Sequence, residues 1–226
     1  MLSAIIMVVA AFVIAGVPTG VWTARVLKGI DIRQHGSGST GATNVWRCVS
    51  KPAGVFVFLI DLLKGYAPTL AAVWLNQGQM AHEWSFAPDW VPVMVALSAL
   101  IGHSKSVFLG FQGGKSAATG LGTLFALCPG GGALTFLTWF VVLGVFKMVS
   151  LASILGVFSC GAWFALFHAP GPFIVYCVIG FIYVTYRHKA NIVRMTKGTE
   201  PKINDKKEEP PTASSEQQQE AGTPQT

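Results

Sequence analysis

The sequence has few charged residues. Charged side chains make up 12% of its 226 residues, whereas an ordinary soluble domain carries about a quarter. Apolar side chains make up 52% and recur in runs close to the ~20 residues that a helix needs to cross a bilayer. This composition excludes a soluble globular fold, and we predict an all-α polytopic membrane protein.

Several catalytic and redox signatures are also absent. The four cysteines show no C-x-x-C spacing, so they indicate small buried residues and neither a metal site nor a disulfide framework. No G-x-S-x-G nucleophile motif occurs. The aspartates are too scattered along the chain to indicate a magnesium site, which needs several oxygen ligands. We therefore expect no metal and no cofactor.

Two glycine motifs match nucleotide-binding loops only superficially. Leu109 stands where a Walker A loop needs its first glycine, five residues before the Gly-Lys pair. Gly36, Gly38 and Gly41 match a dinucleotide fingerprint, yet that fingerprint needs a preceding strand within a βαβ unit, and none is predicted here. We discard both interpretations and expect no nucleic-acid partner.

The sequence is rich in long apolar runs. Candidate spans cover residues 3–24, 53–75, 91–101, 120–128, 133–146, 151–167 and 172–186. The fourth and fifth are ambiguous, because they form either one tilted helix or two short helices broken at residues 129–132. No basic residue precedes the first run, so we read it as a retained helix and not as a cleaved signal peptide.

The placement of basic residues decides between these readings. With the break there are seven spans, and the basic segments all fall on one face, which the positive-inside rule assigns to the cytoplasm. Without the break, Arg187 and the basic residues after it would lie on the opposite side. We therefore predict seven transmembrane helices, with the N-terminus outside and the C-terminus in the cytoplasm.

Two charged residues interrupt the second span. Asp61 and Lys64 are three residues apart and share one helix face. Each would cost about 2.5–3.5 kcal/mol at the centre of a bilayer if it had no partner. A mutual structural pair is the favoured interpretation, and a direct contact with substrate stays open.

The end of the chain has a different composition. Residues 203–226 are dominated by Lys, Glu, Pro, Ser and Gln and contain almost nothing apolar. Such a segment cannot bury enough apolar surface to fold. We predict an integral membrane domain over residues 1–202, followed by a disordered polar tail in the cytoplasm.

The most informative polar segment is GHSKSVFLGFQGGKSAAT, residues 102–119. Gly113 and Gly114 allow backbone N–H groups to converge on an anion, and Lys115 adds a positive charge. The small residues that follow suit the start of a helix whose N-terminal amides face the same anion. The segment predicts a phosphate cradle at a membrane face, while a glycine-rich hairpin with a snorkelling lysine is the alternative.

Two other polar segments have similar chemistry. Residues 36–47 combine three glycines with hydroxyl groups, an amide and Arg47, which are the donors that hold phosphate oxygens. Residues 186–202 follow the last span and carry His188, Asn191 and further cations. Because all three segments are predicted on one face, a shared anion site is more probable than three coincidences.

The three segments together resemble a known family. SGSTGATNVWR, GHSKSVFLGFQGGKSAAT and RHKANIVRMTKGTE, in that order, resemble the three motifs of the bacterial acyl-phosphate:glycerol-3-phosphate acyltransferases of the PlsY type. The similarity spans residues 1–202 and includes KMVSLASI at residues 147–154. Ser39 stands where the family usually has Asn, and Ser116-Ala117 replaces the usual Gly-Val. Both changes keep small residues, so we expect altered loop detail and retained activity.

The resemblance implies an enzyme of phospholipid synthesis in the bacterial inner membrane, with its active site facing the cytoplasm. The reaction moves a fatty acyl group from acyl phosphate to the 1-hydroxyl of glycerol 3-phosphate and gives lysophosphatidate and phosphate. The implied partners are these two substrates and the lipid bilayer, together with a soluble enzyme that produces acyl phosphate.

The resemblance also implies roles for single residues. The candidate catalytic residues are Ser37, Arg47, Lys115, His188 and Asn191. The candidate substrate-binding residues are Gly38, Thr43, Asn44, His103, Gly113, Gly114, Ser153, Arg194 and Glu200. The sequence does not decide whether Ser150 or Ser153 contacts substrate. For His103, Arg194 and Glu200 the alternative to a substrate contact is an architectural role.

The resemblance suggests that no protein base or nucleophile takes part, because the donor's own phosphate accepts the hydroxyl proton. His188 as a general base is the competing idea. No histidine is followed by aspartate five residues later, which argues against the acyl-CoA-dependent class that uses this motif. A transporter for organic phosphates is the non-enzyme alternative, but it predicts internally repeated halves that the sequence lacks.

Overall fold

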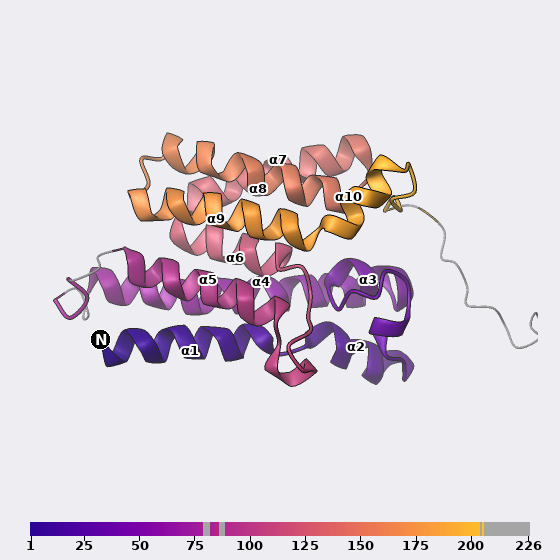
Figure 1. Ribbon diagram of the computed structural model, residues 1–226, viewed down its shortest axis with the longest axis horizontal. Helices are drawn as coiled ribbons and strands as arrows, with labels where there is room; N and C mark the ends of the chain where they lie inside the picture. Colours follow the sequence, from indigo (N-terminus) through magenta and orange to yellow (C-terminus); the bar gives the residue numbers. More distant parts are fainter. Residues whose placement is uncertain (79–81, 86–88, 204, 206–226) are drawn as a thin grey trace, which may run out of the picture.

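The apolar runs fold into helices that lie side by side along one axis (Figure 1). The computed structural model describes residues 1–78, 82–85, 89–203 and 205. The first half contains α1 (Leu2–Gly16), α2 (Thr19–Lys28), α3 (Ala42–Cys48), α4 (Lys51–Gln77) and α5 (Trp90–Ser104). The second half contains α6 (Ala117–Leu127), α7 (Pro129–Phe146), α8 (Val149–Leu166), α9 (Gly171–Arg187) and α10 (Lys189–Thr196). Two 3₁₀ turns, η1 (Ile32–Gln34) and η2 (Val107–Leu109), lie in the polar loops.

The ends of these helices follow from local sequence. Ser50 caps α4, because its hydroxyl oxygen accepts a hydrogen bond from the Ala53 N–H at 3.2 Å. Gly29 ends α2 with a φ of 66°, a left-handed conformation that costs glycine little.

The first apolar run, predicted as a span over residues 3–24, corresponds to the candidate span Leu2–Lys28, but its helix is interrupted. α1 ends at Gly16 and α2 begins at Thr19. Pro18 between them has no N–H to donate, so the helical hydrogen-bond ladder stops there. The carbonyl oxygen of Val17 instead accepts a hydrogen bond from the Lys64 ammonium group of α4.

The ambiguous segment breaks where the sequence suggested. α6 ends at Leu127 and α7 begins at Pro129. A Cβ atom on Gly132 would lie 2.8 Å from the Phe125 backbone, and the Phe125 and Phe136 rings are 6.5 Å apart. Neither contact is possible along one straight helix, which rises 1.5 Å per residue. The chain therefore reverses direction at this point.

Glycines let α4 and α6 pack closely. A Cβ atom on Gly65 would lie 2.0 Å from the Thr119 carbonyl oxygen, and one on Gly122 would lie 2.0 Å from the Leu62 carbonyl oxygen. Small residues at such contacts allow helix backbones to approach each other in membranes. This contact fixes the start of α6, and with it the loop that carries Lys115.

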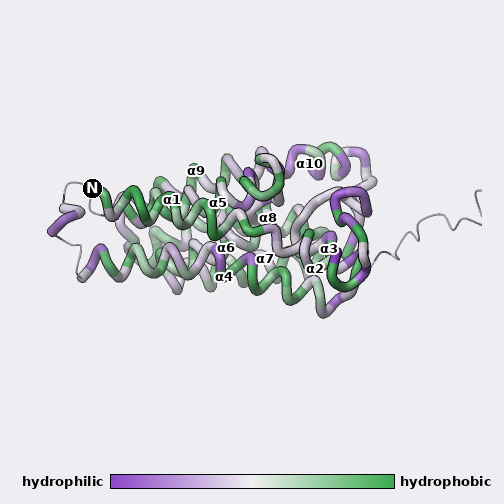
Figure 2. The backbone as a smooth tube through the Cα atoms, turned by 90° about the horizontal axis from the view of Figure 1, so that it is seen from below, coloured by the Kyte–Doolittle hydropathy of each residue, from purple (hydrophilic) through white to green (hydrophobic). Residues whose placement is uncertain are grey.

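Within the part of the chain that the structure describes, four helical segments are long and apolar enough to cross a membrane: Leu2–Lys28, Lys51–Gln77, Pro129–Phe146 and Val149–Leu166. The other predicted spans correspond to the shorter apolar helices α5, α6 and α9. In Figure 2 the hydrophilic residues gather around α3 and α10 at one end of the bundle, and around residues 82–85 at the other. Most of the tail predicted over residues 203–226 lies outside the described residues.

Candidate active site

A cavity opens at the end of the bundle where α3, α10 and the loop before α6 meet. It continues between the apolar helices α6 to α9. Ten of the candidate site residues line it: Ser37, Thr43, Asn44, Arg47, His103, Lys115, Ser153, His188, Asn191 and Glu200. The other four, Gly38, Gly113, Gly114 and Arg194, do not line it. The three polar segments thus converge at one place, although Ser37 and Glu200 are 163 residues apart in sequence.

Asn44 organises the first of these segments. Its amide nitrogen donates hydrogen bonds to the carbonyl oxygens of His35 and Ser39, each at 2.9 Å, and of Ile32 at 3.1 Å. Its oxygen accepts a hydrogen bond from the Ser37 N–H at 3.0 Å. These contacts use both amide hydrogens, so Asn44 acts on the cavity through the shape of the loop. The Ser37 and Thr43 side chains line the cavity beside it.

Close packing explains the two glycines before Lys115. A Cβ atom on Gly113 would lie 2.3 Å from the His103 carbonyl oxygen, and one on Gly114 would lie 2.2 Å from His103 Nε2. Arg187 donates hydrogen bonds to the carbonyl oxygens of Gly113 and Gly114 at 3.2 and 2.8 Å. The loop is therefore clamped between α5 and α9, and this fixes the direction in which Lys115 leaves it.

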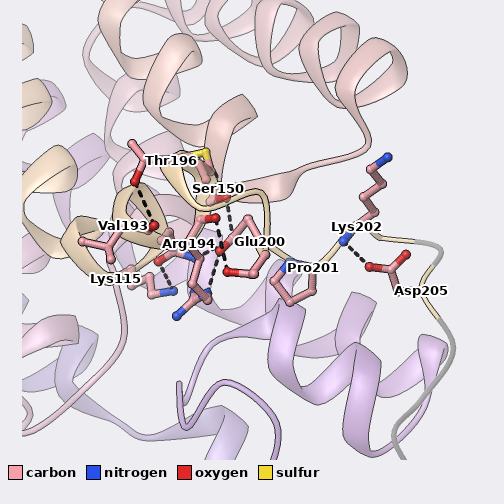
Figure 3. A network of polar contacts seen from close by, with 12 residues as sticks. Lys115, Ser150, Val193, Arg194, Thr196, Glu200, Pro201, Lys202 and Asp205 are labelled. Carbon is pink, nitrogen blue, oxygen red and sulfur yellow. Dashed lines mark hydrogen bonds and ion pairs between the residues drawn. The ribbon is translucent and has the colours of Figure 1, made fainter.

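Lys115 begins a chain of hydrogen bonds that joins the second and third segments (Figure 3). Its ammonium group donates to Asn191 Oδ1 at 2.7 Å, and Asn191 Nδ2 donates to Glu200 Oε1 at 2.7 Å. Ser150 donates to the same Glu200 oxygen at 2.7 Å, and Arg194 donates to Glu200 Oε2 at 2.8 Å. Glu200 is thus the hub that holds Asn191 in position beside Lys115.

The charge state of this network follows from its contacts. Burial alone would raise the pKa of Glu200, but the hydrogen bonds from Ser150, Asn191 and Arg194 outweigh that effect and keep its pKa below the usual value. Burial, reinforced by the positive charge of Arg194, lowers the pKa of Lys115 to about 8. Lys115 is consequently a cation at neutral pH that is close to its titration point.

His188 is held as a neutral imidazole. Its Nδ1 lies 2.8 Å from the Val184 carbonyl oxygen, and because that oxygen can only accept, Nδ1 carries the proton. Burial is the main reason that the pKa of His188 falls to about 4, and the nearby charge of Lys115 contributes. The Nε2 atom therefore has a free lone pair, so His188 can accept a hydrogen bond at the cavity.

Arg47 brings a second cation to the cavity. Its guanidinium donates to the Pro201 carbonyl oxygen at 3.0 Å, so the end of the third segment passes over α3. Ile203 N–H donates to the Lys147 carbonyl oxygen at 2.8 Å and fastens the same stretch to the loop between α7 and α8. Burial lowers the pKa of Arg47, yet a guanidinium remains charged at neutral pH.

The structure distinguishes the contacts of Ser150 from those of Ser153, which the sequence could not do. Ser150 is engaged by Glu200, as described above. Ser153, one turn further along α8, donates to the Val149 carbonyl oxygen at 2.9 Å and accepts a hydrogen bond from the Trp139 indole at 3.3 Å. Ser153 therefore lies where the polar end of the cavity meets its apolar part.

Several cavity or loop residues were missed by sequence reasoning. Trp139 lies in an apolar run with no local signal, and Arg187 was read only as a marker of orientation. Ser116 has a φ of 61°, a conformation that favours glycine, and its hydroxyl donates to the Leu100 carbonyl oxygen at 2.7 Å. Its position, where the resembling family has glycine, is the signal that could have found it.

Comparisons with known proteins agree with this geometry. The family model described as glycerol-3-phosphate acyltransferase matches residues 5–198. A glycerol-3-phosphate acyltransferase of Crocosphaera subtropica is 40% identical over 205 residues, covering 89% of this chain and 94% of the relative. One of Thermosynechococcus vestitus is 42% identical over 197 residues, covering 85% and 92%.

Solved structures of the same family have a similar fold. A crystal structure of PlsY, an integral membrane glycerol 3-phosphate acyltransferase, in its glycerol 3-phosphate form has a TM-score of 0.78 and 33% identity, and the match covers 88% of this chain and 95% of that one. The lysophosphatidic acid form has a TM-score of 0.76 and 35% identity, with the same coverage. The chain therefore belongs to the glycerol-3-phosphate acyltransferase family of the PlsY type.

Proposed function

We propose that the protein transfers a fatty acyl group from acyl phosphate to the 1-hydroxyl of glycerol 3-phosphate, giving lysophosphatidate and inorganic phosphate. Family membership supports the acyltransferase activity and the acceptor. The observation that carries the proposal is the cavity itself: Lys115 and Arg47 lie at its polar end, and mostly apolar side chains line the rest. Such a cavity suits a substrate with an anionic head and a hydrocarbon chain.

In this proposal the cations hold and orient phosphoryl oxygens. Lys115 and the small loop residues Ser37 and Thr43 bind the acyl phosphate, with the N-terminal amides of α6 facing the same oxygens. Arg47 and Asn191 place glycerol 3-phosphate so that its hydroxyl approaches the acyl carbon. Positioning two reactants and stabilising the developing charge are sufficient when the donor is already activated.

The chemical step then needs no protein nucleophile. The glycerol hydroxyl oxygen attacks the acyl carbonyl carbon, the bond from that carbon to the phosphate oxygen breaks, and the leaving phosphate takes the hydroxyl proton. His188 supports this route as a hydrogen-bond acceptor that orients the hydroxyl through Nε2. A pKa near 4 makes it a poor general base, because proton transfer works best when the base has a pKa near the working pH.

We further propose seven membrane crossings, with the N-terminus outside and the active site at the cytoplasmic face of a bacterial inner membrane. The exposed indoles of Trp22, Trp74 and Trp90 near helix ends support this placement, since tryptophan favours the membrane interface. Substrate would then come from the cytoplasmic side, where a soluble enzyme that produces acyl phosphate is the expected partner.

The donor assignment has a direct test. Purified protein in lipid nanodiscs is given radiolabelled glycerol 3-phosphate with either palmitoyl phosphate or palmitoyl-CoA. We expect labelled lysophosphatidate from acyl phosphate and none above background from acyl-CoA. Product from acyl-CoA alone would contradict the proposed donor, while leaving family membership intact.

The lowered pKa of Lys115 predicts the alkaline limb of the pH profile. Lys115 must be protonated to attract phosphate, and its pKa is about 8 in the free protein. The value of kcat/KM for acyl phosphate should therefore hold below pH 7.5 and fall about tenfold per pH unit well above pH 8. In Lys115→Arg the remaining activity should show no such fall up to pH 10. An unchanged limb in this variant would assign the titration to another group.

A further inference from the structure

The cavity has a depth that can be read from its helices. On α8 the lining residues run from Val149 at the polar end to Cys160, a separation of eleven residues, which corresponds to ~16 Å at the rise of an α-helix. A bilayer's hydrocarbon core is ~30 Å thick, so one acyl chain spans ~15 Å in one leaflet. The cavity is thus about as long as one fatty acyl chain.

The far end of this cavity meets a cluster of buried side chains. Its last lining residues are Leu124 of α6, Cys160 of α8, and Tyr176 and Cys177 of α9. The Tyr176 and Thr123 hydroxyls form a hydrogen bond that ties α9 to α6 at this level. The cavity therefore ends on a floor built by three helices.

Buried apolar side chains fill the space one turn beyond that floor. They are Leu127 of α6, Phe164 of α8 and Phe173 of α9, and all three belong to one core cluster. Phe164 is fully buried and packs against Gly131 at the start of α7. An acyl chain that enters from the polar end cannot extend past this layer without displacing these three side chains.

We infer that this floor limits the length of the acyl chain that the cavity can hold. The enzyme's preference for acyl-chain length is then set by the distance from Lys115 to the floor at Tyr176. The inference rests on the proposed function, because it assigns the apolar cavity to the acyl group of the donor. Chains that fill the cavity gain contact with each added methylene, and longer chains must fold back or leave it. Each methylene group that no longer fits inside the cavity should lower kcat/KM about fourfold.

Gly180 offers a way to shorten the cavity without disturbing the fold. It lies on α9 between His188 and Tyr176, is buried, and lines the cavity, yet a Cβ atom there would meet no atom within 4 Å. A larger side chain at this position enters open cavity space about one turn above the floor. Leucine also favours a helix interior more than glycine does.

The test compares acyl phosphates of 10, 12, 14, 16 and 18 carbons in wild type and Gly180→Leu. We expect kcat/KM in the wild type to rise with length and then stop rising. In Gly180→Leu the maximum should move to shorter chains, and the ratio of kcat/KM for 12 carbons to that for 16 should rise at least tenfold. The KM for glycerol 3-phosphate should stay within twofold, because the polar end is unaltered.

Gly144→Leu is the matched control. Gly144 is also a helical glycine with no atom within 4 Å of its Cβ position, but it is exposed on α7 and does not line the cavity. Its chain-length profile should match that of the wild type. A second variant, Phe164→Leu, opens space below the floor and should move the maximum to longer chains.

Two failures are distinguishable. If the wild type uses no acyl phosphate of any length, the proposed function fails. If the wild type uses them and Gly180→Leu changes every chain length by the same factor, the proposed function stands and the chain-length inference is overturned.

Discussion

Replacing Lys115 by alanine should lower kcat/KM for acyl phosphate at least about 10³-fold while the protein remains folded. Lys115 lies at the polar end of the cavity, and in the proposal it contacts the phosphate that becomes the leaving group. Its charge is worth more there than in water, because it is largely buried and its electrostatic interactions are screened less. The measurement is the rate of lysophosphatidate formation with saturating glycerol 3-phosphate, together with Tm in the same detergent.

Lys105→Ala provides the control for removing one positive charge from the same loop. Lys105 is exposed and does not line the cavity, so its loss should change kcat/KM by less than threefold. Equal losses of kcat/KM in the two variants would mean that the overall charge of the loop attracts substrate and that Lys115 makes no specific contact with the phosphate. A Tm of Lys115→Ala far below that of wild type would mean that its bond to Asn191 is mainly structural.

Much of the fold could be predicted because the bilayer imposes simple rules. Long apolar runs must become helices, and each predicted run does contain a helix. The reversal at Pro129 was indicated by proline and three glycines in succession. The break at Pro18 was missed, although the proline marks it in the sequence. The sequence could not show that Lys64 of α4 donates a hydrogen bond to the Val17 carbonyl oxygen at this break.

The site was predictable at the level of segments but not at the level of contacts. Glycines and cations mark the three polar segments, and the structure brings those segments together. Sequence reasoning could not show that Asn44 uses its amide within its own loop, or that Glu200 holds Asn191. Such roles depend on which atoms meet across the bundle. Residue type indicates the donors and acceptors, whereas tertiary packing decides whether a ligand or the protein uses them.

The pair formed by Asp61 and Lys64 shows the same limit, because its location suits both structural and substrate roles. The two side chains are 2.8 Å apart, and both are almost fully buried within α4. Lys64 also donates to Val17, and His103 Nδ1 lies 3.9 Å from the Asp61 carboxylate. Asp61 lines the cavity, which keeps a role in turnover open. The number of contacts within the protein favours a structural role.

A double-mutant cycle should show strong coupling between them. Asp61→Leu leaves the Lys64 charge buried without its carboxylate, which should cost about 3–5 kcal/mol and lower Tm by about 10 °C. Lys64→Met should have a similar effect, since it strands the carboxylate. The double variant has no stranded charge and should recover at least half of the loss, the remainder being the lost hydrogen bond from Lys64 to the Val17 carbonyl, which keeps its bond from the Thr19 N–H. Leu63→Ala, at an exposed position of the same helix, should lower Tm by no more than about 2 °C.

Turnover in the double variant decides between the two roles. If the pair is structural, the activity that remains should follow the folded fraction, with kcat close to wild type after correction for it. A folded double variant that has lost more than a hundredfold in kcat would show instead that Asp61 or Lys64 acts on substrate. Additive losses of Tm, with the double variant as unstable as the sum of the single variants, would contradict the mutual pair, because the energy of one shared contact cannot be lost twice.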